Sequence, residues 1–234
     1  MQRAFVLVHG AWHGAWCWRR VADLLTAAGH RVFAPTLTGL GERSHLADAG
    51  INLSTHVADV VNVVKWEQLD YVVLAGHSYA GFVISGVAER LEGAIASLVF
   101  VDAFVPENGD TVATSASPAT RRLVEEAVLK GETMLSPVPA AFFQVNDKDR
   151  AWVDALCVPQ PLATFQETAE LTGARERIAK KAYVRAKGYA SVSFDTALAK
   201  VRAMPSWRTF ELACGHDIMV DMPERLTEIL LDSA

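Results

Sequence analysis

The sequence has 234 residues, of which 51% are hydrophobic and 21% are charged, and its formal net charge is −5. This composition supplies enough apolar residues for a packed core and excludes an intrinsically disordered chain. The negative net charge argues against a nucleic-acid-binding surface. The three cysteines, Cys17, Cys157 and Cys214, form neither a disulfide framework nor a zinc motif, which favours a reducing, cytoplasmic location. No apolar run reaches the ~20 residues that cross a bilayer, so we expect no membrane partner.

Short apolar runs recur along the chain and predict strands that are covered on both faces of a parallel sheet. They lie at residues 5–8, 32–34, 71–75, 98–101, 182–185 and 209–212. Helical periodicity falls between them, at residues 21–28, at residues 57–64 behind Ser54 as a possible cap, and at residues 82–91. Pro223 is predicted to begin a last helix. This alternation indicates one α/β domain with about six mostly parallel strands and helices on both faces.

The segment 105–180 interrupts this alternation. It contains no convincing core strand and has helical patterns at residues 120–130, 147–156 and 164–171. We therefore predict a core made of residues 1–104 and 181–234, with residues 105–180 inserted as a helical cap or lid. The charges of the insertion are expected to form a solvated face rather than a partner site. They are Arg121, Arg122, Glu125, Glu126, Arg175, Glu176 and Arg177.

The most specific motif is the segment 76–81, which reads G-H-S-Y-A-G. It follows a predicted strand and precedes a predicted helix, which is the context of a nucleophile elbow. In such a turn Ser78 is held in a strained conformation with its hydroxyl exposed, and Gly76 allows the strand and helix backbones to approach. Ala80 stands where the pattern has glycine, which is a mild departure. The alternative interpretation is a plain turn with a surface serine.

Residues 9–12, which read H-G-A-W, follow the first predicted strand. A turn of this kind supplies one backbone N–H of an oxyanion hole, and the residue after the nucleophile supplies the other. The two predicted donors are Ala11 and Tyr79. The alternative is that the glycines only make a tight turn. His9 and His13 lack the glutamate and the helix of a metal motif, so we expect no metal and no cofactor.

His216 follows the last predicted strand, where an imidazole can reach the serine and act as general base. The acid that orients this histidine is expected after a late strand. Asp102 directly follows the strand at residues 98–101 and is the preferred candidate, and Asp195 is the second. Asp102 could instead cap the entrance to the lid.

Four aromatic residues are candidates for an apolar substrate pocket, although ordinary core packing explains each of them equally well. They are Trp12, Phe142, Phe143 and Phe165.

Four motifs together resemble the esterase branch of the α/β-hydrolase superfamily, which includes bacterial pyrethroid-hydrolase-like carboxylesterases, plant methylesterases and plant hydroxynitrile lyases. These motifs are residues 8–16, residues 37–43, residues 76–78 and residues 215–220. The resemblance covers nearly the whole chain and is weakest at residues 110–180. It implies a six-stranded core with a helical lid, and ester substrates with a substantial apolar part. In the plant lyases a threonine and a lysine occupy the places of Gly10 and Asp217, which argues against cyanohydrin cleavage.

The sequence therefore predicts a serine carboxylesterase that acts on small to medium apolar esters, with Ser78 as nucleophile, His216 as base and Asp102 as acid. A small-molecule ester is the expected partner, and the chain is expected to be a monomer or a homodimer. Two alternatives keep the fold. One is lyase, C–C hydrolase or cofactor-free oxygenase chemistry, and the other is a ligand receptor without catalysis.

Overall fold

The computed structural model describes residues 2–234 and places six parallel strands in one sheet, in the order β2-β1-β3-β4-β7-β8. The strands are β1 (Ala4–Val8), β2 (Arg31–Phe33), β3 (Val72–His77), β4 (Ile95–Val101), β7 (Lys180–Ala186) and β8 (Trp207–Leu212). All six predicted strands are confirmed to within a few residues. The central strands β1 and β3 are buried along their whole length because helices cover both faces.

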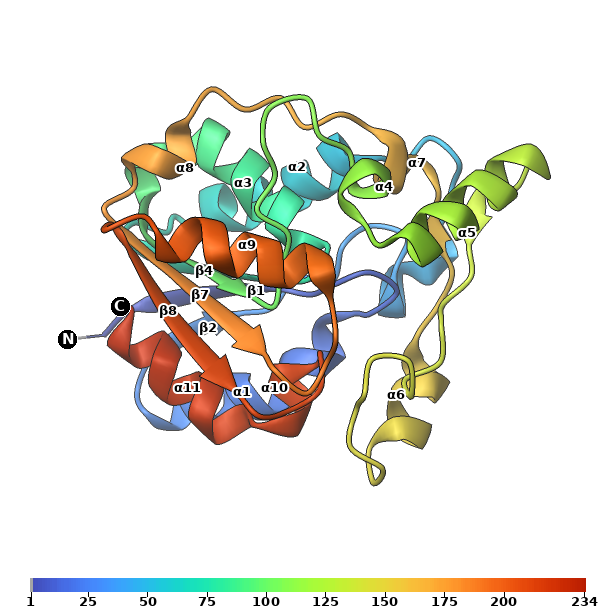
Figure 1. Cartoon of the computed structure of the whole chain (residues 1–234). Helices are drawn as coiled ribbons and strands as arrows, with labels where there is room; N and C mark the ends of the chain where they lie inside the picture. The colour runs from blue at the N-terminus through green and yellow to red at the C-terminus, as the bar shows by residue number, and fades with distance from the viewer. Residues whose placement is uncertain (1) are drawn as a thin grey trace.

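Figure 1 shows the two helical layers that enclose the sheet. On one face lie α1 (Arg19–Ala27) and α11 (Pro223–Asp232), and on the other lie α2 (Leu53–Trp66), α3 (Ala80–Leu91) and α9 (Val192–Arg202). Pro223 begins α11, as predicted. None of the helices within residues 2–234 is both long and apolar enough to cross a membrane.

The cap of α2 differs from the prediction. The helix begins at Leu53, and Asn52 is its cap, with its side-chain oxygen accepting a hydrogen bond from the Thr55 N–H at 3.0 Å. The Asn52 N–H in turn donates to Oγ1 of Thr55, which completes a capping box. Ser54 was therefore the wrong candidate, and its hydroxyl instead donates to Glu167.

The chain between β4 and β7 lies outside the six-stranded sheet. It contains α4 (Val112–Ser115), α5 (Pro118–Leu129), α6 (Arg150–Leu156), α7 (Ala163–Gln166) and α8 (Ala174–Arg177), with a small antiparallel pair of β5 (Met134–Leu135) and β6 (Gln160–Pro161). The predicted helix at 164–171 is wrong beyond residue 166. The amides of Ala169 and Leu171 bond to the carbonyl of Asp110 and the side chain of Asn108 instead of to a helix.

The remaining elements are short helical turns. They are η1 (Ala15–Trp18), η2 (Gly41–Leu46), η3 (Glu92–Ala94) and α10 (Ile218–Asp221).

The carboxyl ends of the parallel strands meet at one edge of the sheet, which is where ligands bind in α/β proteins. The segments that leave this edge carry Ala11 after β1, Ser78 after β3, Asp102 after β4, Tyr189 after β7 and His216 after β8. Topology therefore gathers residues that are more than 200 positions apart in the sequence.

Candidate active site

Ser78 stands on the sharp turn between β3 and α3, with a left-handed backbone conformation (φ 53°) that is unfavourable for a serine. The conformation is held from both sides, because the Ser78 N–H donates to the Val101 carbonyl at 3.2 Å and the Ser78 carbonyl accepts from the Phe104 N–H at 3.2 Å. The side chain is half-buried, so its hydroxyl remains accessible.

Two glycines allow this turn to form. A Cβ at Gly76 would lie 2.8 Å from the Ala80 carbonyl oxygen, which agrees with the predicted close approach of strand and helix. A Cβ at Gly81 would lie 1.9 Å from the Phe104 carbonyl oxygen. The second crowded position is therefore residue 81, and the methyl group of Ala80 is accommodated in the core.

Asp102 and His216 form a short polar contact at the carboxyl edge of the sheet. Asp102 follows β4, is fully buried and has a positive φ of 43°. Its Oδ2 lies 2.6 Å from Nδ1 of His216. An ionised carboxylate only accepts hydrogen bonds, so Nδ1 donates and Nε2 of the ring is free to accept a proton.

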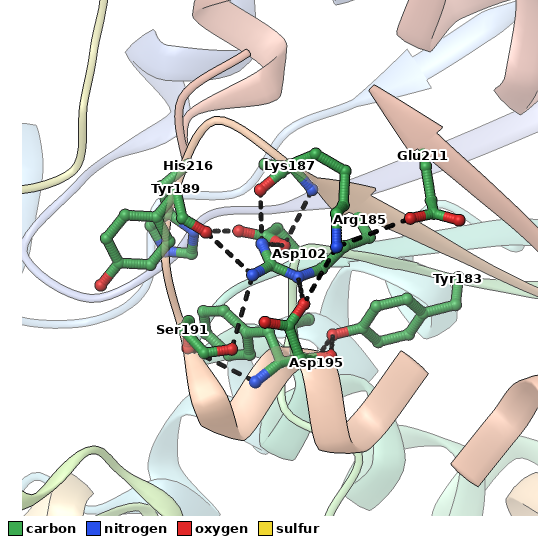
Figure 2. A network of polar contacts seen from close by, with 12 residues as sticks. Asp102, Tyr183, Arg185, Lys187, Tyr189, Ser191, Asp195, Glu211 and His216 are labelled. Atoms are coloured by element: carbon green, nitrogen blue, oxygen red, sulfur yellow. Dashed lines mark hydrogen bonds and ion pairs between the residues drawn. The ribbon is translucent and has the colours of Figure 1, made fainter. Parts of the chain in front are cut away.

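The other oxygen of Asp102 has two donors. Oδ1 accepts from Nη1 of Arg185 at 2.9 Å and from the backbone N–H of Ala186 at 3.0 Å. The second acid candidate, Asp195, has a 49% exposed side chain and bonds to Arg185 and Lys187 rather than to His216. Figure 2 shows Asp102 in the middle of this network. The structure thus brings Asp102, and not Asp195, to the histidine.

Aromatic rings fix the orientation of His216. Phe194 stacks on it with ring centroids 5.2 Å apart and an interplanar angle of 13°, and Tyr189 lies 4.8 Å away. The backbone N–H of His216 donates to the Phe143 carbonyl at 2.9 Å.

Ser78 and His216 line the same cavity. No hydrogen bond within 3.5 Å joins Ser78 Oγ to the imidazole among the described residues 2–234. Such contacts are often long in unliganded hydrolases and shorten when substrate binds.

The backbone amides of Ala11 and Tyr79 belong to residues that line this cavity. Across residues 2–234, neither amide has an internal hydrogen-bond partner. Gly10 brings the first loop close, since a Cβ there would lie 2.7 Å from Nδ1 of His77 and 3.1 Å from Cβ of Ser78. Two unused N–H groups therefore flank the serine, as an oxyanion hole requires.

The cavity around Ser78 has two parts. The inner part, about 60 Å³, is lined by all four aromatic residues proposed from the sequence, Trp12, Phe142, Phe143 and Phe165. Trp12 lies between Phe143 and Phe165, with centroid distances of 6.0 Å and 5.8 Å. The outer part is a groove of about 1050 Å³ between the segment 104–121 and the segment 188–200, and Phe142 and Tyr189 line both parts.

A buried cluster beneath the site was not anticipated from the sequence. Nε2 of His13 lies 3.0 Å from Oδ2 of Asp217, and Nδ1 of His13 donates to the Ala11 carbonyl at 2.7 Å. Nε2 of His77 donates to the His216 carbonyl at 3.1 Å. Burial lowers the pKa of His13, but the charges and hydrogen bonds of Asp217 and Cys157 together outweigh burial and raise the pKa well above its ordinary value. The cluster ties the loops that carry Ala11, Ser78 and His216 to one another.

The sequence gives only one hint of this cluster, which is that two of its members neighbour predicted site residues. His77 directly precedes Ser78, and Asp217 directly follows His216. From the sequence alone, His13 stands out only as a possible metal ligand together with His9. In the structure the two rings have separate partners, and His9 Nε2 accepts from the Leu37 N–H at 3.0 Å. No group of three or more His, Cys, Asp or Glu side chains in the described chain is arranged to hold a metal ion.

A doubly covered parallel sheet with a serine elbow after β3 and a histidine after the last strand defines an α/β hydrolase. The chain belongs to the alpha/beta hydrolase family, whose model matches residues 5–229.

Two curated relatives match almost the whole chain. A carbendazim-hydrolysing esterase of Nocardioides sp. (strain SG-4G) is 42% identical, and the match covers 97% of each protein. The esterase PIR7B of Oryza sativa subsp. japonica is 26% identical over 100% of this chain and 96% of its own. The chain is accordingly a carboxylic ester hydrolase.

The solved structures agree on the fold. An extracellular α/β-hydrolase from a Paenibacillus species superimposes with a TM-score of 0.86 at 21% identity, over 99% of both chains.

Proposed function

We propose that the protein hydrolyses esters by two-step acyl transfer, with Ser78 as nucleophile, His216 as general base and Asp102 as the acid that orients it. The observation that carries this proposal is the 2.6 Å contact between Asp102 and His216, whose free Nε2 shares a cavity with the Ser78 hydroxyl. A serine hydroxyl is a weak nucleophile at neutral pH, so it needs a base positioned in this way.

In the first step Nε2 of His216 takes the proton from Oγ of Ser78 as that oxygen attacks the ester carbonyl carbon. The carbonyl oxygen becomes an oxyanion, which accepts hydrogen bonds from the Ala11 and Tyr79 amides. His216 then protonates the leaving alcohol, and the acyl group remains on Ser78. In the second step His216 activates a water molecule, which releases the acid and restores the serine. Asp102 stabilises the imidazolium that forms in each step.

The lining of the cavity supports small to medium apolar esters as substrates. The inner part is narrow and aromatic and fits the smaller side of an ester, whereas the outer groove has room for a larger group. The inserted segment 105–180 is the lid in this proposal, and its residues within 105–121 and 138–143 supply much of this lining.

The location proposed for the protein is the cytoplasm, where Cys17, Cys157 and Cys214, all three free in the structure, remain reduced. Its partner is the small-molecule ester, and a monomer or homodimer without bound nucleic acid suffices for this chemistry.

The test is the hydrolysis of p-nitrophenyl butyrate by the wild type and by Ser78→Ala. We expect Ser78→Ala to lower kcat by at least about 10³-fold. Ser206→Ala is the matched control, because this exposed serine precedes β8 at the opposite edge of the sheet. Unchanged activity of Ser78→Ala would contradict the mechanism, and no turnover of any ester by the wild type would favour a lyase or a receptor.

A further inference from the structure

A buried guanidinium lies behind the Asp102–His216 pair. Arg185, at the end of β7, has a side chain that is only 1% exposed. Each of its five N–H groups has an acceptor, as Figure 2 illustrates. These acceptors are the carboxylates of Asp102 (2.9 Å) and Asp195 (3.0 Å) and the backbone carbonyls of Ala186 (2.5 Å), Tyr189 (2.8 Å) and Ser191 (3.4 Å).

The Asp102 carboxylate cannot rotate while this guanidinium holds it. Oδ1 is occupied by Arg185 and by the N–H of Ala186, so only Oδ2 faces the imidazole. We propose that Arg185 is a positioning residue of the active site, which fixes Asp102 so that Oδ2 accepts the hydrogen bond from Nδ1 of His216. The inference rests on the proposed function, in which this pair activates Ser78.

Arg185 also supports the histidine ring through its aromatic neighbours. Its Nη2 holds the Tyr189 carbonyl, and the Tyr189 ring packs against His216. The guanidinium carbon lies 6.0 Å from the ring centroid of Phe194, which stacks on the imidazole. A lysine would keep the charge but has three donors in place of a planar fork of five, so it could not hold these partners together.

The charge of Arg185 has a separate effect on proton transfer. Asp102 stabilises the imidazolium of His216, and a guanidinium on its far oxygen offsets part of that stabilisation. Asp195 in turn offsets part of the guanidinium charge. Removing Arg185 should therefore make His216 easier to protonate, and removing the Asp195 charge should make it harder.

The other titratable groups around this pair carry little free charge. Burial raises the pKa of Tyr189 and of Cys214 to about 12, and it raises the pKa of Tyr183 well above its ordinary value, so these three groups stay neutral. Burial lowers the pKa of His77 well below its ordinary value, so this ring is neutral as well. Asp217 is ionised but paired with His13. The charge of Asp217 also acts on His216 but is the same in every variant compared below, so the charges whose removal is tested are those of Arg185 and Asp195.

Asp195 and Glu211 provide a matched comparison. Both carboxylates are partly exposed, at 49% and 39%, and both lie near Nζ of Lys187, at 3.5 Å and 3.6 Å. Only Asp195 also bonds to Arg185. Asp195→Asn and Glu211→Gln therefore remove the same charge from the same surface, and only one of the two changes acts on the guanidinium.

The experiment records two pH midpoints in each variant, the acid limb of kcat/KM for p-nitrophenyl butyrate and the NMR titration of the His216 ring. We expect Asp195→Asn to lower both midpoints by roughly half a unit, and Glu211→Gln to move them by less than about 0.2 unit. Arg185→Met should raise them by about one unit and lower the plateau kcat at least about tenfold. Arg185→Lys should lower the plateau kcat similarly and leave the midpoints near those of the wild type.

Equal midpoints for Asp195→Asn and Glu211→Gln would show that Arg185 is not coupled to His216 through Asp102, and would overturn the inference even where the Arg185 variants do not fold. A wild-type plateau kcat in a folded Arg185→Lys would contradict the positioning role, because lysine keeps the charge and loses the fork of donors. The NMR titration does not depend on turnover. An inactive wild type with the expected midpoints would therefore refute the esterase mechanism and leave the placement of Asp102 by Arg185 standing.

Discussion

Replacing Asp102 by asparagine is predicted to abolish most of the activity by changing the tautomer of His216. The change is nearly isosteric, so the amide occupies the place of the carboxylate. Arg185 and the Ala186 N–H both donate to the Oδ1 position, and only an oxygen can accept from them. The amide oxygen is therefore fixed on that side, and the NH2 group is turned toward His216.

The magnitude follows from this orientation. An NH2 group facing Nδ1 at the position of the present 2.6 Å contact requires Nδ1 to be unprotonated, which places the ring proton on Nε2. That nitrogen then cannot take the proton of Ser78. In hydrolases with the same arrangement the loss in kcat is about 10⁴-fold, or about 5 kcal/mol of barrier, and we expect a loss of that order.

The assay is steady-state hydrolysis of p-nitrophenyl butyrate near neutral pH, with thermal unfolding followed by circular dichroism to confirm that the variant is folded. Asp195→Asn is the control and should keep a plateau kcat within a few-fold of the wild type. A nearly normal kcat for Asp102→Asn, with a large loss for Asp195→Asn, would refute the assignment and transfer the acid role to Asp195.

Three further predictions concern the pocket, the oxyanion loop and acid stability. Phe165→Ala should widen the inner cavity, so the ratio of kcat/KM for p-nitrophenyl octanoate over butyrate should rise; an unchanged ratio would place the ring outside the binding site. Gly10→Ala puts a methyl group 2.7 Å from His77, so we expect kcat to fall by about 10²-fold while the protein remains folded, and normal kinetics would contradict this account of the loop. The hydrogen bonds from Arg20 lower the pKa of Asp149 to about 2. Because the pKa is lower in the folded state, this pair stabilises the fold above pH 4, and its contribution is lost as the pH falls through 2. Asp149→Asn should therefore reduce the free energy of urea unfolding by about 2 kcal/mol at pH 7, and by less at pH 2; equal losses at both pH values would exclude this linkage.

The sheet was predictable from the sequence because its signals are local. Continuous apolar runs mark β1, β3 and β4, and the segment 76–81 encodes its own turn through small residues that lie next to one another in the chain. The cap of α2 shows the limit of such patterns. Ser54 and Asn52 are both good caps, and only the pair of reciprocal hydrogen bonds between Asn52 and Thr55 selects Asn52.

The supporting residues of the site could not be predicted because their partners are distant in the sequence. In the sequence, Arg185 looks like an ordinary strand residue. Its partner Asp102 is 83 positions away, and the two meet only because β4 and β7 pair in the sheet. Likewise His13 and Asp217 are 204 positions apart and meet only through the fold. Asp102 could be preferred to Asp195 from the sequence because it directly follows a predicted parallel strand. The carboxyl ends of parallel strands lie at one edge of the sheet, so this position places Asp102 at the same edge as Ser78 and His216.

The identity of the nucleophile is tested most directly by trapping it. Treating the wild type with diethyl p-nitrophenyl phosphate and mapping the modified peptide by mass spectrometry should place one diethylphosphoryl group on Ser78, in step with the loss of esterase activity. Ser78→Ala should remain unmodified. Inactivation with the label on a different residue, or full labelling of Ser78 without loss of ester hydrolysis, would contradict the central claim that this serine carries the acyl group.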